Sequence, residues 1–263
     1  MNGDLSYNTN SLQTYNPTTH TGINTNVINH TDSPDQDAAL YTVANANDSN
    51  VPDSNYQSRK VSIAGTIHGS SQADLDSRID TFRGYFAQRN KNLDIAYGSG
   101  TRRYVVMKIN TFSLSRSNKS LYASFTIEFL CKPFGFDTST TSLLSHTGFT
   151  SATVTDTPTV GGTAPYQLPV YTITINSLTG SGDYVQISND NNGQEILLYG
   201  LGLTAGDVIV VDAENRSVTV NGDEVDYYGT FLELEPGASS LTYTDGFTTR
   251  NVDIAASYTK RYF

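Results

Sequence analysis

The stretch Lys60-Val-Ser-Ile-Ala-Gly65-Thr-Ile-His68, followed by Gly69-Ser70-Ser71 and residues 72–89, decides the fold of this chain. Its first part alternates apolar and other residues, which is the period of a half-buried β-strand. The apolar members are Val61, Ile63 and Ile67. Gly65 stands where a further apolar residue is due, which predicts a β-bulge or a close approach of another backbone.

An α-helix is predicted directly after this strand, over residues 71–89. Ser71 has the chemistry of an N-cap, and Asp74 follows three residues later as the acidic partner of a capping box. The apolar residues then recur at spacings of four, three and four, which places them on one helical face. This core face consists of Leu75, Ile79, Phe82 and Phe86. We therefore expect the helix to lie on a sheet, with Gly84 as a weak position or a close contact.

Residues 1–58 are rich in Asn, Thr, Ser and Asp. Short apolar patches at 22–28 and 38–44 predict two strands, joined by long polar connections. Such a segment buries too little apolar surface to fold alone. We expect it to pair with the following sheet or to reach another subunit as an arm.

Two further strands are predicted after the helix, at 103–112 and 121–131, joined by a hairpin loop. The first domain, residues 1–136, is therefore interpreted as a mostly antiparallel sheet with one crossing helix. Residues 137–165 combine Thr, Ser, Gly and Pro with scattered apolar residues, and this composition predicts an extended linker or edge arm.

Residues 166–263 show an all-β pattern of short strands separated by turn residues, which predicts a β-sandwich. Asn221-Gly222 predicts a type I′ hairpin turn, because both residues accept positive φ angles, and Asn192-Gly193 predicts a second hairpin. The predicted strands are 170–176, 184–188, 195–199, 207–212, 217–220, 224–228, 230–234, 240–243 and 251–258. The fold class is therefore mainly β with one helix.

The formal net charge of −10 is unevenly distributed. Residues 1–58 hold six acidic and no basic side chains, residues 59–132 hold five acidic and twelve basic ones, and residues 133–263 hold fifteen acidic and four basic ones. One interpretation is chance together with the solubility of an acidic β domain. The other is that the basic middle segment faces an acidic surface, either of its own chain or of a neighbouring subunit.

No catalytic, cofactor or metal site is predicted. The four histidines lie apart, without the spacing of a zinc site or a hydrolase motif. Cys131 is the one cysteine and lies on an apolar strand, where a core position is the usual role. Sequence-specific nucleic acid binding is not indicated, because basic and aromatic residues do not cluster in one recognition element. No apolar run has membrane-spanning length, and without a signal peptide we expect folding in a cytoplasm.

Several of these segments resemble the ring-forming domain of siphophage distal tail proteins. They are the run 56–67, the helix segment 74–82, the strand 103–109, and Phe125-Thr-Ile-Glu-Phe129-Leu-Cys-Lys-Pro133-Phe134. The C-terminal part resembles the second domain of that family, through segments 172–176, 218–222, 234–243 and 254–263. The resemblance spans residues 40–263.

The resemblance implies a structural protein of the virion, made in the host cytoplasm. Members of this family resemble tail-tube proteins in fold and form a hexameric ring at the tail tip. The ring joins the tail-tube protein above to a trimeric hub protein below. The second domain, galectin-like in many members, projects outward and can hold receptor-binding proteins, and the tape-measure protein is a further candidate partner. No catalytic residues carry over, so an enzyme is not implied.

The basic surplus of residues 59–132 then becomes an interface hypothesis, with Arg59, Lys60, Arg102 and Arg103 as candidate contacts between subunits. Three other interpretations stay open from the residues alone. They are a tail-tube protein with an extra domain, a soluble carbohydrate-binding module or adhesin, and an enzyme such as a glycosidase or peptidase. The absence of Trp opposes the carbohydrate-binding module, since aromatic platforms would then have to come from the seventeen Tyr.

Overall fold

The structure is a computed structural model, and it describes residues 5–29, 36–37, 41–42, 49–50, 55–88, 91–117, 119–180 and 184–263. The chain divides into two compact units. The first consists of Met1–Thr138 with Phe263, and the second of Ser139–Tyr262. Each unit has its own hydrophobic core, so we describe each by itself.

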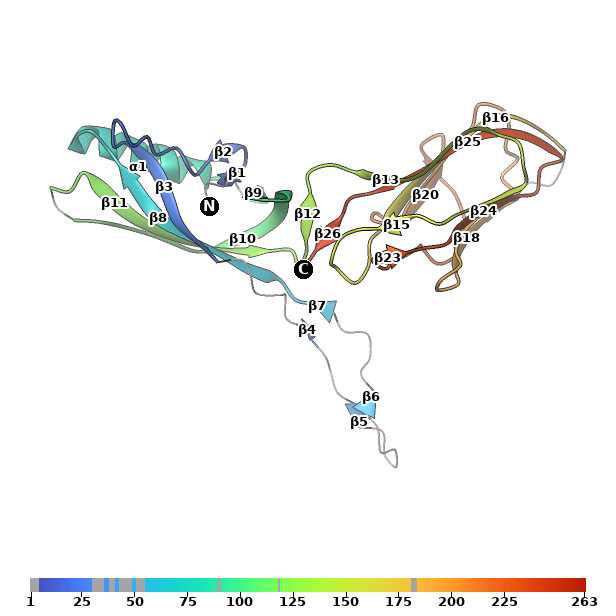
Figure 1. Cartoon of the computed structure of the whole chain (residues 1–263), viewed down its shortest axis with the longest axis horizontal. Coiled ribbons are helices and arrows are strands. Elements are labelled where there is room, and N and C mark those ends of the chain that lie inside the picture. The colour runs from blue at the N-terminus through green and yellow to red at the C-terminus, as the bar shows by residue number, and fades with distance from the viewer. Residues whose placement is uncertain are drawn as a thin grey trace. The chain divides into compact units, whose positions relative to one another are not determined.

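The first unit is built on an antiparallel sheet with the strand order β2-β1-β9-β10-β11-β8-β3 (Figure 1). A further strand, β12 (Gly135–Asp137), pairs with β10. The bounds are β1 Leu5–Tyr7, β2 Asn10–Ser11, β3 Gly22–Asn29, β8 Arg59–His68, β9 Asn92–Tyr97, β10 Gly100–Arg116 and β11 Tyr122–Cys131. The predicted strands 103–112 and 121–131 correspond to β10 and β11, whereas β1 and β2 were not predicted.

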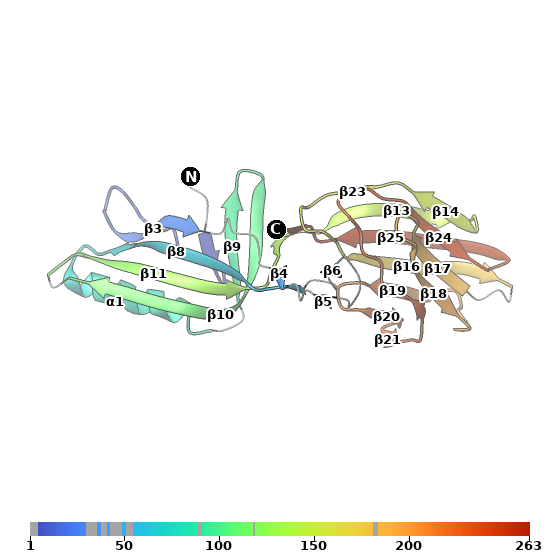
Figure 2. The ribbon, with the colours of Figure 1, turned by 90° about the horizontal axis from the view of Figure 1, so that it is seen from below.

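The helix α1 (Gln72–Tyr85) lies along one face of this sheet, against β8 and β11 (Figures 1 and 2). Leu75, Ile79 and Phe82 are buried in the core of the unit. Phe86, the C-cap residue, is partly buried against the same core. Burial of three large apolar side chains stabilises the helix by roughly 4–9 kcal/mol before entropy is counted.

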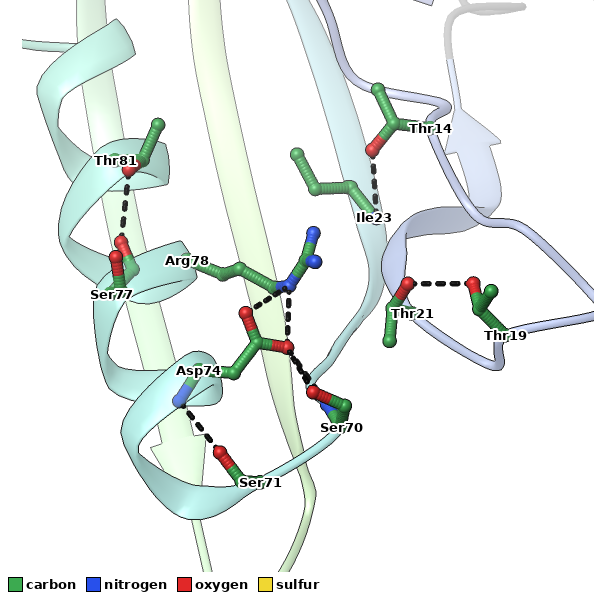
Figure 3. Close-up of polar contacts among 10 residues, drawn as sticks. All are labelled: Thr14, Thr19, Thr21, Ile23, Ser70, Ser71, Asp74, Ser77, Arg78 and Thr81. Atoms are coloured by element: carbon green, nitrogen blue, oxygen red, sulfur yellow. Dashed lines mark hydrogen bonds and ion pairs between the residues drawn. The ribbon is translucent and has the colours of Figure 1, made fainter.

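The N-terminus of α1 is capped by two serines rather than one (Figure 3). The Ser71 hydroxyl accepts a hydrogen bond from the Asp74 backbone N–H at 3.2 Å, as predicted for the N-cap. The Asp74 carboxylate, however, accepts from the backbone N–H of Ser70 at 2.8 Å and from its hydroxyl at 3.1 Å. Asp74 also binds the Arg78 guanidinium at 3.0 Å. The reciprocal bond of the expected capping box is therefore made one residue earlier.

Gly65 and Gly84 differ in their surroundings. A Cβ at Gly65 would lie 2.2 Å from the backbone oxygen of Asn24 and 2.8 Å from the Phe125 ring, so a close approach explains this glycine. The bulge lies on the neighbouring strand, where the register of β3 shifts between Thr25 and Val27. A Cβ at Gly84 would meet nothing within 4 Å, so Gly84 is a tolerated weak position.

Two short antiparallel ladders lie in the N-terminal segment. β4 (Gln36–Asp37) pairs with β7 (Asn55–Tyr56), and β5 (Tyr41–Thr42) pairs with β6 (Ser49–Asn50). Of the strand predicted at 38–44, only Tyr41–Thr42 belongs to the described residues.

The second unit is a β-sandwich of two antiparallel sheets, with the core between them. One sheet has the order β13-β25-β16-β19-β20-β21 and the other β14-β24-β17-β18-β22, and β15 pairs with β23. The bounds are β13 Thr141–Phe149, β14 Thr153–Asp156, β15 Thr159–Val160, β16 Pro169–Thr179, β17 Tyr184–Asn189, β18 Gln194–Tyr199, β19 Val208–Asp212, β20 Ser217–Val220, β21 Asp223–Glu224, β22 Tyr228–Gly229, β23 Gly237–Ala238, β24 Leu241–Asp245, β25 Thr249–Tyr258 and β26 Arg261–Tyr262. The predicted fold class is confirmed.

Residues 137–165 correct one expectation. Instead of a linker or arm, they supply β13, which pairs with β25, β14, which pairs with β24, and β15. These are edge strands, and Leu144 is the one side chain of β13 that is buried, so a Thr- and Ser-rich composition suffices to form them. Pairing with an apolar partner strand, and not their own hydrophobicity, fixes their position.

The turns of the second unit follow the glycine chemistry of the sequence. Asn221 and Gly222 have φ angles of 54° and 91°, which is the pair of positive angles that a type I′ turn requires. Asn192-Gly193 also lies in a hairpin, the one that joins β17 to β18. The predicted strand 230–234 is wrong, since that segment contributes only an isolated bridge between Leu234 and Gln167.

Candidate assembly interface

Within the described part of the chain, the outer edge of β10 is unpaired along its second half. β9 pairs with β10 over Gly100–Val105, and the last bond of that edge runs from the Val106 N–H to the Lys91 carbonyl at 3.0 Å. Residues 107–116 pair with β11 on one side, and among the described residues no strand pairs with their other side. Unpaired backbone groups at a sheet edge are a template for another strand.

Apolar side chains accompany this edge. Register shifts between Val106 and Lys108 and between Ile109 and Thr111 mark two irregularities of β10. Met107, at the first of them, is 41% exposed, and Phe112 is 36% exposed. Beside them lies a groove of about 550 Å³, lined by residues that include Tyr7, Phe86, Val106, Met107 and Ile109. The edge therefore offers apolar surface as well as backbone donors and acceptors.

The opposite edge of the sheet is β3, and it is covered differently. The N–H groups of Thr14 and Tyr15 both donate to the Ile23 carbonyl at 2.9 Å, so an irregular segment shields the first half of β3. The second half, residues 26–29, has no strand on its outer side within the described part of the chain. The two edges of the sheet are thus unlike each other.

The sheet face away from α1 is mostly polar, and small side chains form its middle rows. In neighbouring strands Ser124 lies opposite Thr66, Thr126 opposite Ala64, and Glu128 opposite Ser62. On β10, Ser113 lies opposite Thr126 and Ser115 lies opposite Ser124, so both serines belong to this face. Because side chains alternate along each strand, the apolar neighbours of these residues lie on the helix side.

Three of the four basic residues expected at an interface lie at or near the surface. Lys60 is exposed on the polar face. Arg103 makes a bidentate ion pair with Asp94, with Nε–Oδ1 and NH2–Oδ2 distances of 2.8 Å, and the hydrogen bonds that it donates to Asp94 raise the pKa of this guanidinium. The Arg102 guanidinium lies 4.4 Å from the ring centroid of Tyr97, the geometry of a cation–π contact.

Arg59 is buried, contrary to the expectation that its charge lies at the surface. It is 3% exposed, and its Nε and NH1 atoms have no hydrogen-bond acceptor among the residues that the structure describes. Its guanidinium lies 5.7 Å from the Tyr104 ring centroid. The strand alternation explains this position, because Arg59 shares the core-facing side of β8 with Val61 and Ile63.

Sequence reasoning missed the β10 edge, because the predicted strand stopped at Phe112. The signal was present: Ser113, Leu114 and Ser115 continue the alternation of polar and apolar residues up to Arg116. The burial of Arg59 could also have been predicted, because the alternation along the strand puts Arg59 on the same side as Val61 and Ile63.

The described residues hold no group of three His, Cys, Asp or Glu side chains that could bind a metal ion. In the part of the chain that the structure describes, no helix is both long and apolar enough to cross a membrane.

Two protein-family models match the chain, one in each unit. The model for the phage tail protein RIFT-related domain matches residues 11–131, and the model for the C-terminal domain of siphovirus-type tail components matches residues 161–262. A comparison with curated protein sequences finds no match.

Among solved structures, the chain is similar to the SPP1 Dit (gp 19.1) protein, described as a paradigm of the hub adsorption apparatus of phages that infect Gram-positive bacteria. The TM-score is 0.67 at 12% identity, with 99% of each chain covered, so the two share a fold. Chains of the phage P2 baseplate in its activated conformation are also similar, one with Ca (TM-score 0.44, 9% identity, 99% of this chain and 98% of that chain) and one with Sr (0.41, 11%, 96% and 97%).

Since the two family models together match most of the chain, it belongs to the siphovirus-type tail proteins, and the predicted resemblance to distal tail proteins is confirmed. The chain is therefore a structural component of the phage tail, and so of the virion. Its second unit is the galectin-like sandwich of that fold.

Proposed function

We propose that this protein closes into a ring at the tail tip, a hexamer as the family resemblance implies, which joins the tail tube to the tip hub. The observation that carries the proposal is the sheet of the first unit, which has two unlike edges, β10 over residues 107–116 and β3 over residues 26–29, that no strand of the described residues pairs with on their outer sides. Pairing of unlike edges is a heterologous contact, and such contacts generate rings when the rotation closes.

The polar face supports a ring with an open centre. A curved sheet that continued through all subunits would turn one face outward, toward α1, and the other inward. The inward face would carry the hydroxyl groups of residues such as Ser113, Ser124 and Thr126. Small hydroxylated side chains suit the wall of a water-filled passage, because they need no covering by apolar partners.

The partners proposed for the ring are those that the family resemblance implies. One rim of the ring would receive the tail-tube protein and the other the trimeric hub protein. The second unit would project outward as an attachment point for receptor-binding proteins, and the tape-measure protein would end at the ring. The protein would be made in the host cytoplasm and would act as a connector without catalysis.

Basic residues of the first unit are proposed to contact acidic surface of the next subunit. Of the four candidates, Lys60 and Arg102 test this contact best. Arg59 is buried and Arg103 is committed to Asp94, so reversal of either charge would disturb the subunit itself.

The experiment measures the mass of the purified chain in solution and images it by negative stain. The proposal expects six-fold rings with a central opening. Met107→Asp, at the exposed β10 edge, and Lys60→Glu with Arg102→Glu should each reduce the assembly to folded monomers. Arg216→Glu, an exposed charge reversal in the second unit, is the matched control and should leave the rings intact.

Two results would contradict the proposal. One is a monodisperse monomer at every concentration that the protein tolerates. The other is an assembly whose size is the same in Met107→Asp as in the unchanged protein, which would show that the β10 edge takes no part in it.

A further inference from the structure

The two most exposed tyrosines among the described residues lie on the same face of the second unit. Tyr199, at the end of β18, and Tyr228, in β22, are each 68% exposed. Tyr228 lies directly opposite Leu197, two residues before Tyr199. Both rings therefore stand on the outer face of the five-stranded sheet, as diagonal neighbours across one strand pair.

Hydrogen-bonding side chains continue this face beyond the two rings. Gln186 lies opposite Leu197 and donates to Glu195 Oε2 at 2.5 Å. The next strands carry threonine pairs, with a distance of 2.8 Å between the Thr155 and Thr242 hydroxyl oxygens. Across the sheet, the face thus changes from aromatic to amide and carboxylate, and then to hydroxyl.

We infer that this face binds an uncharged saccharide, with Tyr199 and Tyr228 as its stacking platforms. A sugar ring presents an apolar C–H face that packs on an aromatic ring, and hydroxyl groups at its rim that need donors and acceptors. The two tyrosine rings supply the first requirement, and Gln186 and Glu195 supply the second.

The negative charge of this part of the protein favours an uncharged ligand over an anionic one. Glu195 is the charged residue of the β17 and β18 part of this face, and residues 133–263 carry fifteen acidic against four basic side chains. Phosphate-rich or carboxylated polymers and nucleic acid would therefore meet repulsion here.

The small size of the aromatic surface favours a saccharide over a protein partner. Two tyrosines that are each 68% exposed offer together roughly 200–350 Å². A stable protein interface buries about 800 Å² on each partner, around an apolar centre. The tyrosine pair matches the area of a few sugar rings and falls well below that of a protein interface.

The test uses the full chain and isothermal titration with uncharged oligosaccharides of glucose, galactose and N-acetylglucosamine. We expect at least one of them to bind. Tyr199→Ala with Tyr228→Ala should weaken that binding at least tenfold, whereas Tyr199→Phe with Tyr228→Phe should keep it within about threefold, because stacking needs the ring and not the hydroxyl. Tyr122→Ala, which removes a 51% exposed tyrosine from the first unit, is the matched control and should change nothing.

Three outcomes would overturn the inference: binding of none of the oligosaccharides, equal binding by the double Ala variant, or binding of a poly-lysine peptide alone. Ring formation does not enter this measurement. A failure here therefore leaves the proposed assembly untouched, and a failed ring would leave this site untouched.

Discussion

The Tyr243 hydroxyl donates a hydrogen bond of 3.0 Å to Oδ2 of Asp245, and both residues are buried in the second unit. Oδ1 of the same carboxylate accepts from the Phe247 backbone N–H at 3.0 Å and from Arg250 Nε at 2.7 Å. The Arg250 side chain is only 10% exposed. A buried carboxylate is thus satisfied on both oxygens, with one guanidinium as its counter-charge.

Arg250→Met should destabilise the second unit strongly. The change leaves the buried Asp245 carboxylate without its cation, and breaking a buried ion pair on one side costs about 3–5 kcal/mol. Differential scanning calorimetry should show the corresponding transition lowered by about 10 °C or more. Arg83→Ala is the control, because the Arg83–Asp80 pair is exposed and 3.5 Å long, and it should shift the transition of the first unit little. Equal shifts in the two variants would contradict this account.

A pair of glycines in the first unit should respond to Ala in opposite directions. Gly65→Ala places a Cβ 2.2 Å from the Asn24 oxygen and 2.9 Å from Thr25 Cα, both backbone atoms, so β3 and β8 must separate. Gly84→Ala meets nothing within 4 Å and should stabilise α1 by about 0.5–1 kcal/mol. Urea unfolding of the two variants measures both changes. A stabilising Gly65→Ala would mean that the strands are not packed at this distance.

The sequence pattern predicted the elements whose signal lies within a short stretch of the chain, such as a helix that buries one face or a turn set by its own residues. α1 is an example, because the recurrence of Leu75, Ile79 and Phe82 encodes its direction toward the sheet. The Asn221-Gly222 turn is another, because its backbone angles depend on the two residues themselves.

Elements that depend on a distant partner were missed. β13 and β14 consist mostly of polar residues and take their position from β25 and β24, which lie about a hundred residues further along the chain. The same holds for β1, whose Leu5 and Tyr7 are buried against β9. The aromatic face of the second unit was also hidden, because Tyr199 and Tyr228 meet only through the pairing of β18 with β22.

The contribution of Asp74 to stability should depend on pH. Hydrogen bonds from the Ser70 backbone, followed by that from Arg78, hold the pKa of this carboxyl below its ordinary value of 3.8. A depressed pKa means that the contribution is fully present above the unfolded-state value and is lost as the pH falls through the lower folded-state value. Asp74→Asn should therefore be less stable than the unchanged protein near pH 7, and the difference should shrink as the pH falls below 3.8.

Asp80→Asn controls for charge removal from the same helix, since the contact of Asp80 with Arg83 is exposed. Urea unfolding of the three proteins near pH 7 and below pH 3.8 provides the comparison. A difference between Asp74→Asn and the unchanged protein that stayed constant with pH would show that the carboxylate bonds to Ser70 do not stabilise the helix start.

Cys131 should be inert toward Ellman's reagent in the folded protein and react fully in guanidinium chloride. It is the one cysteine of the chain, so the readout has a single source. Its thiol is fully buried, and burial raises its pKa to about 12, against an opposing effect of Arg59. At pH 8 the thiolate fraction is then about one in ten thousand, compared with about a quarter for an ordinary thiol. Labelling therefore requires β11 to leave the core, and Gly65→Ala should accelerate it. Fast labelling of the unchanged protein would place Cys131 outside the core that packs α1 on the sheet.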